Sequence, residues 1–509
     1  MKFLKKIINR FTFVTLAILI QLIWIIVGAA YLSNYYYYLS YVFSALSLVV
    51  VIFIISKDAD PGIKLAWVVP ILIFPLFGWI IYILFGTRLP SNRMRKRFAD
   101  SDRSTVRKLP THPEVLNEIC AIDQYVGCQM RYPADHNYPA YKNSSVKYYP
   151  SGEEWFADLM SDIRSAEKFI FLEYFIISEG EMWAEIEKAL VEKVGQGVDV
   201  RVVYDDFGSI NYLPSKYHRI LESRGIKCVA FNRYKPFLSV VQHNRDHRKI
   251  AVIDGKSGYT GGANISDEYI NLKVRFGYWK DAAIRIEGDA VDTLTAIFLE
   301  MWNCNRKENE GDISDFIAQA QYAAGGSGGG YVQPFGDSPL DGETLSENIY
   351  LNMISHAKKY VYIFTPYVAT DNLMSEALIL AVKRGVDVRM VIPEIPDKKI
   401  VYQLTKSHCY YLSKGGVRIY SYTPGFLHSK CIICDDEIAA VGTVNLDYRS
   451  LRHHFECGCI LYKCPAIADI YDDFVKTFYI SKHARLSKRR VGLIRSFFFT
   501  LLRLFSPLF

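Results

Sequence analysis

Acidic side chains are absent from the end of this chain and scarce at its beginning. Residues 474–509 hold eight Lys and Arg but no Asp or Glu, and residues 1–108 hold 14 basic side chains against four acidic ones. The whole chain has 60 basic and 53 acidic residues, so the middle, residues 109–473, is net negative. An acidic body disfavours nucleic-acid binding, whereas basic ends favour docking on an anionic membrane.

No regular cysteine spacing indicates a disulfide framework. The ten cysteines of this 509-residue chain are irregularly spaced, which is typical of reduced thiols. Cys431 and Cys434 have no second pair at the spacing of zinc ligands and lie in an apolar run, so we expect buried thiols. Half of the residues are hydrophobic and 14% are aromatic, which excludes intrinsic disorder, collagen and coiled coil.

Three long apolar stretches lie near the N-terminus. They run over about Phe11–Leu32, Leu39–Ile55 and Ile63–Phe85, and their lengths suit helices that cross about 30 Å of hydrocarbon. We therefore predict a helical transmembrane region of two to three helices over residues 1–87. Basic residues on both sides leave two orientations open. The larger cluster, from Arg88 to Lys108, favours a multi-pass protein of the cell membrane with a cytoplasmic body.

The body follows a basic juxtamembrane connector, residues 88–140, and shows the same order of segments twice. An apolar run, an amphipathic helical pattern and the sequence Gly-Val-Asp-Val-Arg occur over 166–201 and again over 357–389. Short apolar runs that alternate with helical patterns indicate βαβ units. We predict two pseudo-symmetric α/β domains, residues 141–320 and 331–480, each with a mixed sheet covered by helices.

The final segment, residues 481–509, is predicted to be a basic amphipathic tail. A helix with this pattern lies in the headgroup layer of anionic lipid. A terminal helix packed on the body is the alternative.

Each predicted domain carries one copy of a polar motif in which a Lys, an Asp and an Asn follow a His at gaps of two, seven and 17 residues. The two copies are His247, Lys249, Asp254 and Asn264, and His428, Lys430, Asp435 and Asn445. A gap of two on a strand places His and Lys on the same face of the sheet. Identical offsets on matching scaffolds argue against a chance likeness.

Two imidazoles brought together by a pseudo-two-fold axis can divide the chemistry of phosphodiester transfer. One attacks phosphorus as a nucleophile, while the other protonates the leaving alkoxide and then deprotonates the next hydroxyl. The Lys and Asn side chains supply charge and donors to the non-bridging oxygens. Asp281 and Glu456 lie downstream, where each can orient the second nitrogen of a histidine. Asp254 and Asp435, at the strand ends, are interpreted as structural hydrogen-bond anchors.

The doubled motif resembles the signature of the phospholipase D superfamily, His-x-Lys-x4-Asp followed by Gly-x-x-Asn. The resemblance covers about residues 145–480, in a superfamily that includes phospholipases, nucleases, a tyrosyl–DNA phosphodiesterase and phospholipid synthases. Within it, Trp67–Gly86, Gly442–Ser450 and Phe505–Phe509 are similar to segments of bacterial cardiolipin synthases. The pair His453-His454 departs from the Asn usual in that family, and its role is left open.

The resemblance implies a phosphatidyltransferase that joins two phosphatidylglycerol molecules into cardiolipin and releases glycerol through a phosphatidyl-histidine, without a metal or other cofactor. The family's six signature residues map onto His247, Lys249, Asp254, His428, Lys430 and Asp435 as the catalytic set. Asn264, Asn445, Asp281 and Glu456 are expected to bind or orient the phosphate. The implied partners are phosphatidylglycerol and anionic membrane lipid, with no nucleic acid and no obligatory protein partner. A membrane-bound phospholipase D that hydrolyses phospholipids to phosphatidic acid is the alternative.

Overall fold

A computed structural model describes most of the chain. The described residues are 23, 33–57, 60–75, 78–79, 82, 86, 92–233, 244–306, 312–317, 329–484, 486 and 503–504. The chain divides into two compact units. The first consists of Met1–Pro90, Lys235–His243 and Gly492–Phe509, and the second of Ser91–Tyr234 and Asn244–Val491.

The first unit contains two described helices with assigned bounds, α3 (Ser33–Ile55) and α4 (Pro61–Ile73). Asp60 caps α4, because its carboxylate accepts hydrogen bonds from the backbone N–H groups of Gly62 and Ile63. Apolar side chains of both helices form one small core together with Tyr82. The second predicted apolar stretch therefore lies in α3, and the third begins in α4. The first, Phe11–Leu32, lies outside the described residues except for Ile23.

The third apolar stretch is not one continuous helix. The helix α4 ends at Ile73, and the next residue, Phe74, has φ −123° and ψ 73°. Pro75 follows, and a proline disfavours helical geometry in the residue before it. Within the described part of the chain, no helix combines the length and the hydrophobicity needed to cross a membrane. The predicted transmembrane region is therefore not confirmed.

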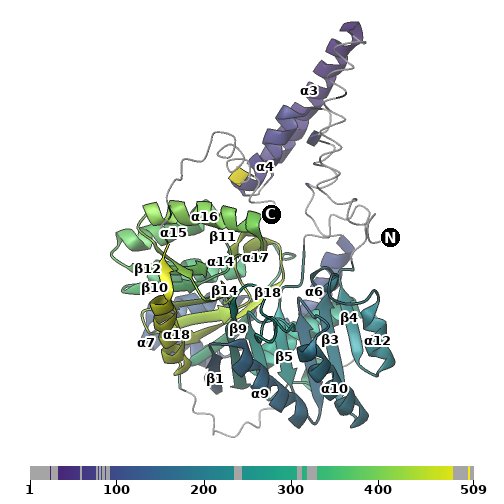
Figure 1. Ribbon diagram of the computed structural model, residues 1–509, viewed down its shortest axis with the longest axis vertical. Helices are drawn as coiled ribbons and strands as arrows, with labels where there is room; N and C mark the ends of the chain where they lie inside the picture. Colours follow the sequence, from purple (N-terminus) through teal and green to yellow (C-terminus); the bar gives the residue numbers. More distant parts are fainter. Residues whose placement is uncertain are drawn as a thin grey trace. The chain divides into compact units, whose positions relative to one another are not determined.

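The second unit contains two mixed sheets, drawn in teal and in green to yellow in Figure 1. The first sheet has seven strands in the order β1-β8-β6-β5-β2-β3-β4, of which β2, β3 and β4 are parallel. Its strands are β1 (Ser144–Tyr149), β2 (Phe169–Tyr174), β3 (Asp199–Asp205), β4 (Lys227–Phe231), β5 (Lys249–Ile253), β6 (Ser257–Gly261) and β8 (Ala283–Gly288). Its larger helices are α9 (Gly152–Ser165), α10 (Glu181–Gly195), α12 (Tyr217–Ser223) and α13 (Val291–Asn305).

The second sheet has eight strands in the order β19-β13-β12-β10-β15-β16-β18-β9, of which β10, β12 and β13 are parallel. Its strands are β9 (Tyr331–Asp337), β10 (Tyr360–Phe364), β12 (Asp387–Pro393), β13 (Arg418–Tyr422), β15 (Cys431–Cys434), β16 (Ile438–Gly442), β18 (Glu456–Tyr462) and β19 (Ser481–His483). Its larger helices are α14 (Leu345–His356), α15 (Asn372–Lys383), α16 (Lys399–Lys414) and α18 (Ala466–Ile480). Apart from β19, the order is that of the first sheet, so the prediction of two matching α/β domains is confirmed.

The cores explain how the two domains form one body. One core cluster joins α13 of the first domain to strands of the second sheet, and a separate cluster lies under α9, α10 and α12 on the other face of the first sheet. Two short pairings also link the domains. The strand β7 (Tyr278–Lys280) is parallel to β14 (Gly425–Leu427), and Asp246 forms an isolated bridge with Phe455.

The predicted connector is folded onto this body as α6 (Asn92–Ser104), α7 (Pro113–Ile122) and α8 (Gln124–Asp135). The Ser101 hydroxyl donates to the carbonyl oxygen of Glu300 at 2.7 Å. The first three residues of the predicted tail form β19, which pairs with β13. From residue 487 onward, the tail lies outside the described residues except for 503–504.

Candidate active site

Both motif histidines lie where one domain is hydrogen-bonded to the other. The backbone N–H of His247 donates to the carbonyl oxygen of Phe455 at 2.9 Å, and that of His428 donates to the carbonyl oxygen of Lys280 at 2.7 Å. In each case the residue after the accepting carbonyl is one of the two predicted orienting acids. The pairing therefore brings each acid to the histidine of the opposite domain.

The side chains form two crossed His–carboxylate pairs. Nδ1 of His247 lies 2.9 Å from both carboxylate oxygens of Glu456, and Nδ1 of His428 lies 2.7 Å from Oδ2 of Asp281. Both acids are fully buried, and both histidines are nearly so. When Nδ1 donates to the carboxylate, the lone pair of the ring is at Nε2. Each imidazole is thus oriented by an acid from the other half of the molecule.

The two motif lysines lie beside their histidines, as the gap of two residues requires. The ammonium group of Lys249 donates to the carbonyl oxygen of His247, and that of Lys430 donates to the carbonyl oxygen of His428. Burial lowers the pKa of Lys249 to about 8 and that of Lys430 to about 7. Burial therefore destabilises the charged form of each lysine, and a bound anion would stabilise it.

Burial favours the neutral form of both histidines when no phosphate is bound. Burial, together with the nearby charge of Lys430, lowers the pKa of His428 to about 4. Burial lowers the pKa of His247 well below its usual range, and the charges of Lys249, Lys430 and His428 add to this effect. Because residues of the second motif act on His247, the two motifs share one electrostatic environment. Each histidine also contacts an acid of the opposite domain, so the structure places both motifs at the junction between the domains.

The pKa values of the two orienting acids shift in opposite directions. Burial raises the pKa of Glu456 well above its usual range, which favours its neutral form. Burial also acts to raise the pKa of Asp281, but the charges of His428 and Lys430 outweigh it and hold this pKa below its usual value. The ionised carboxylate is therefore more stable at Asp281, beside His428, than at Glu456, beside His247.

The two motif aspartates lie at the far ends of their strands and accept backbone hydrogen bonds. Asp254 accepts from the N–H groups of residues 167–169 at 2.7–2.8 Å, and Asp435 from those of residues 358–360 at 2.6–2.9 Å. Both residues have positive φ, 54° and 58°, which Asp tolerates better than most residues. Their contacts are those of structural anchors that join the end of one strand to the start of its neighbour.

Comparison with known protein families agrees with this architecture. A family model described as "Cardiolipin synthase, PLD-like domain" matches residues 159–302 and 350–478, which is one match to each domain and more than half of the chain. The chain belongs to the cardiolipin synthase family of phospholipase D-like proteins. A second model, "Phospholipase_D-nuclease N-terminal", matches residues 45–86, which include the C-terminal part of α3 and all of α4.

Individual relatives extend over almost the whole chain. An uncharacterised protein of Streptococcus mutans is 40% identical over 463 residues, which span 87% of this chain and 97% of that protein. A cardiolipin synthase of Halalkalibacterium halodurans is 34% identical over 478 residues, which span 92% of this chain and 93% of that protein. The crystal structure of a phosphatidylserine synthase of Haemophilus influenzae covers 72% of this chain and 93% of its own, with a TM-score of 0.54. At 16% identity, that likeness supports the fold alone.

The two asparagines of this cardiolipin synthase family member have different surroundings. Asn264 accepts a hydrogen bond from the backbone N–H of Ile176 at 3.0 Å and donates to the hydroxyl of Tyr269 at 2.8 Å. The side-chain oxygen of Asn445 is buried and has no hydrogen-bond partner among the described residues. Phosphate binding by both asparagines stays a prediction, and Asn264 has the additional structural task of positioning Tyr269.

Several neighbours of the histidines are missed by the sequence pattern. The ring of Phe175 lies 5.1 Å from that of His247, and the rings of Tyr269 and Trp279 lie 5.4 and 5.5 Å from that of His428. The only sequence signal for Phe175 is its position directly after the first strand of the repeat. Aromatic walls of this kind shield the imidazoles from water.

Each copy has a residue next to its orienting acid two positions before the motif Asn. This residue is Gly262 in the first domain and Thr443 in the second. The Thr443 hydroxyl donates to Glu456, whereas a Cβ added at Gly262 would lie 2.0 Å from Oδ1 of Asp281. A side chain is therefore excluded at Gly262. The two halves of the site are related but not identical.

His454 is a third imidazole at the site. Its ring lies 5.6 Å from that of His247, and its Nδ1 lies 3.8 Å from Oε1 of Glu456. Within the described ranges, His247, His454 and Glu456 are the one group of His, Cys, Asp or Glu side chains close enough to hold a metal ion. The buried ammonium group of Lys249 acts on the same carboxylate and opposes a cation there.

Proposed function

We propose that this protein is a cardiolipin synthase that transfers a phosphatidyl group from one phosphatidylglycerol to another. The observation that carries this proposal is the crossed pairing of two histidines with two acids, which provides one site with a nucleophile and a separate acid–base group. The relatives named as cardiolipin synthases supply the substrate class. Phosphatidylglycerol suits both steps, because it has a phosphodiester to cleave and a free primary hydroxyl to accept.

The reaction has two steps with opposite proton transfers. Nε2 of His247 attacks phosphorus and forms a P–N bond as the P–O bond to glycerol breaks. His428, which would bind a proton at Nε2 when the phosphodiester anion enters the site, gives that proton to the glycerol oxygen. In the second step His428 takes the proton of a hydroxyl on the second lipid. The oxygen of that hydroxyl forms a P–O bond as the P–N bond to His247 breaks, which releases cardiolipin.

The electrostatics of the two pairs support this division of roles. A group that holds a proton during the reaction benefits from an ionised partner, and the carboxylate of Asp281 has its pKa held below the usual value. A nucleophile needs a free lone pair, and His247 has a strongly lowered pKa beside an acid whose pKa is raised. We therefore assign the proton transfers to His428 and the attack to His247.

Lys249 and Lys430, with Asn264 and Asn445, would hold the non-bridging oxygens of the phosphate. Both lysines are buried and have lowered pKa values, so an incoming phosphodiester anion would stabilise their charged forms. Asp254 and Asp435 would support the site indirectly, because they hold the strands that begin next to the lysines. No step of this scheme uses a metal ion or a nucleotide.

The family match over residues 45–86 supports membrane association. We propose a multi-pass protein of the cell membrane, with the second unit on the cytoplasmic side. The interacting molecules in this proposal are phosphatidylglycerol and anionic lipid. Nucleic acid and an obligatory protein partner have no part in it.

The decisive experiment uses the purified full-length protein with phosphatidylglycerol as the only lipid substrate. We expect about one glycerol released for each cardiolipin formed, with little phosphatidic acid, because a site closed by aromatic side chains disfavours water as the acceptor. Phosphatidic acid as the main product would favour the hydrolytic alternative. A requirement for CDP-diacylglycerol would overturn the mechanism.

A further inference from the structure

A short loop next to His428, residues Asn271–Gly277, is held firmly at its base. The side chain of Asn271 accepts from the backbone N–H of Trp279 at 2.7 Å and donates to its carbonyl oxygen at 3.0 Å. Both Asn271 and Gly277 have positive φ, 56° and 72°. A Cβ at Gly277 would lie 2.4 Å from the carbonyl oxygen of Pro424. We call residues 271–277 the rim loop.

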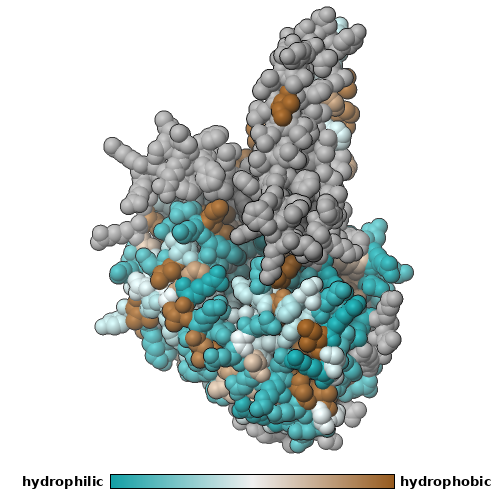
Figure 2. Space-filling view, turned by 45° about the vertical axis from the view of Figure 1, so that its right-hand side comes forward, coloured by the Kyte–Doolittle hydropathy of each residue, from teal (hydrophilic) through white to brown (hydrophobic). Residues whose placement is uncertain are grey.

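The rim loop presents apolar and basic side chains in alternation. Leu272 and Val274 are 58% and 75% exposed. The side chains of Lys273 and Arg275 are 65% and 52% exposed, and their nearest acidic partner, Glu268, is 3.8–3.9 Å away. On the face shown in Figure 2, the described surface of the second unit is largely hydrophilic with separate hydrophobic patches. Two exposed aliphatic side chains that alternate with two cations suit a bilayer, because acyl chains can surround the aliphatic groups and anionic headgroups can bind the cations.

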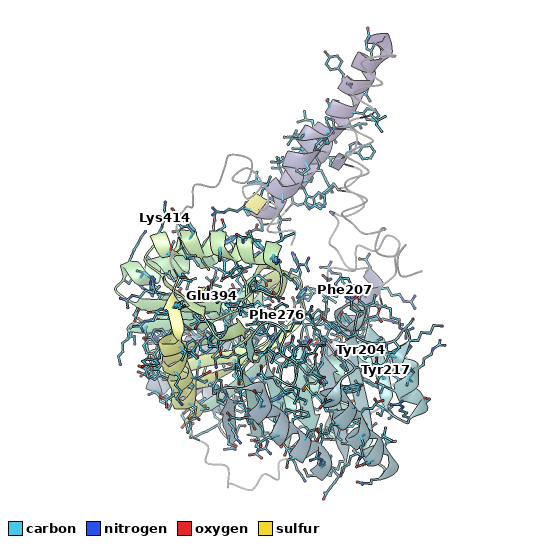
Figure 3. The ribbon with its side chains drawn as sticks, in the orientation of Figure 1. Tyr204, Phe207, Tyr217, Phe276, Glu394 and Lys414 are labelled. Carbon is cyan, nitrogen blue, oxygen red and sulfur yellow. The ribbon has the colours of Figure 1, made fainter. Side chains whose placement is uncertain are left out.

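The loop rises from the wall of the active site. Tyr269 and Trp279, which flank it in the sequence, both pack on the ring of His428. Phe276 in the loop lies 6.4 Å from Trp279 and 6.1 Å from Phe426. Figure 3 shows Phe276 near the junction of the teal and green halves of the body. The exposed end of the loop is therefore only a few residues from the reacting groups.

A second exposed apolar turn lies next to His247. It is the short helix α11 (Asp206–Ser209), where Phe207 is 47% exposed. The turn packs tightly on Phe175, since a Cβ at Gly208 would lie 2.1 Å from the Phe175 carbonyl oxygen. Phe175 in turn contacts the His247 ring. Each histidine thus has an exposed apolar segment close to it.

We propose that the rim loop dips into the bilayer, with Leu272 and Val274 among the acyl chains and Lys273 and Arg275 at anionic headgroups. This inference rests on the proposed function, because it gives a phosphatidylglycerol headgroup a path from the lipid surface to His428 without full extraction of the lipid. Burial of one Leu or Val side chain changes a binding equilibrium by roughly tenfold or more. The loop therefore contributes to lipid capture rather than to the chemical steps.

The direct test measures the surroundings of position 274 in the full-length protein reconstituted into bilayers of phosphatidylcholine with phosphatidylglycerol. Cys120 and Cys128, the cysteines that are not buried, are first replaced by serine. V274C is then labelled with an environment-sensitive fluorophore, and nitroxide groups on the acyl chains serve as quenchers. V191C on α10, where Val191 is 37% exposed, is the matched control. We expect a blue-shifted, quenched label at position 274 and an unquenched label at position 191. Equal, water-like emission at both positions would overturn the proposal.

A kinetic test distinguishes a role of the rim loop in lipid capture from a role in the chemical steps. The variant L272S/V274S should lose about tenfold or more in cardiolipin formation on vesicles at low surface concentration of phosphatidylglycerol. It should keep the wild-type rate on a short-chain phosphatidylglycerol that dissolves as monomers. Equal losses on both substrates would contradict a role confined to lipid capture. If the wild-type protein formed no cardiolipin from either substrate, the proposed function would fail, while the fluorescence test would still report on the loop.

Discussion

Replacement of Asp281 by Asn isolates the contribution of one crossed pair. Asn has the shape of Asp but no charge, and it keeps an oxygen that can accept from the backbone N–H of Ala282, now at 2.9 Å. The group that replaces Oδ2, which lies 2.7 Å from Nδ1 of His428, is then an N–H donor. In the neutral form, His428 must turn the lone pair of Nδ1 toward that donor, so its proton moves to Nε2. In the protonated form, the imidazolium loses the negative charge of its partner.

The expected loss follows from the charge that is removed. The carboxylate of Asp281 is fully buried, and two unit charges about 4 Å apart attract each other by about 4 kcal/mol at an effective dielectric constant of 20. Since about 1.4 kcal/mol corresponds to a tenfold change in rate, D281N should lower kcat about a thousandfold. Glu456→Gln should cost clearly less, because burial already raises the pKa of Glu456 toward the neutral form.

The assay is cardiolipin formation by purified full-length variants in mixed micelles of phosphatidylglycerol, with glycerol release as the second readout. Asp473→Asn is the matched control, since Asp473 is a buried carboxylate paired with Lys280 at 2.7 Å and contacts neither histidine. D473N loses a buried ion pair and is expected to be less stable, so rates are compared per folded protein after thermal unfolding measurements. Retention of more than a tenth of the wild-type rate by D281N would refute the role of the crossed pair. Equal losses in D281N and E456Q would refute the opposite pKa shifts of the two acids.

Four further predictions test the remaining parts of the site. Replacement of either His247 or His428 by Ala should reduce turnover below a tenth of the wild-type rate in the same assay, because each step uses both imidazoles. Activity should persist in EDTA, since two buried lysines supply the positive charge at the phosphate; a direct requirement of the chemical steps for a divalent ion would contradict this. Asp254→Asn should lower the free energy of unfolding by about 2 kcal/mol through lost charge-assisted hydrogen bonds, yet change kcat per folded protein less than either histidine variant does. Burial lowers the pKa of Lys430 to about 7 from an ordinary value of 10.5, so between pH 7 and pH 10.5 the unfolded chain binds a proton that the folded protein has lost. The free energy of unfolding should therefore rise with pH over this range. Lys430→Met should remove this part of the rise, as measured by chemical denaturation at several pH values.

The fold and the motif positions could be predicted because they depend on short-range patterns. Apolar runs, helical periodicity and the duplicated Gly-Val-Asp-Val-Arg segments indicate two α/β repeats, and the strand orders of the two sheets confirm them. The gap of two residues between His428 and Lys430 predicts that both side chains lie on one face of an extended segment. In the structure the two residues lie between β14 and β15, and Nζ of Lys430 is 2.8 Å from Nδ1 of His428. Local backbone geometry is sufficient for each of these inferences.

The packing of the predicted connector, residues 88–140, could not be predicted from the sequence pattern. Their polar composition predicts a connector, but α6, α7 and α8 pack on the body. Phe98 of α6 stacks on Phe455 at 4.7 Å, next to the acid that orients His247. Phe98 and Phe455 are hundreds of residues apart in the sequence, so this packing depends on contacts that no local window contains.

The sequence by itself determined that two copies of one motif exist, which residue types they supply and which acids are available to orient the histidines. Only the tertiary structure decided that the acids are exchanged, so that Glu456 serves His247 and Asp281 serves His428. The reason is the backbone pairing of the domains: the N–H of each histidine binds the carbonyl oxygen of the residue before the opposite acid. The opposite pKa shifts of the two acids likewise arise from burial and from neighbours in the other domain, which are properties of the assembled body rather than of either motif.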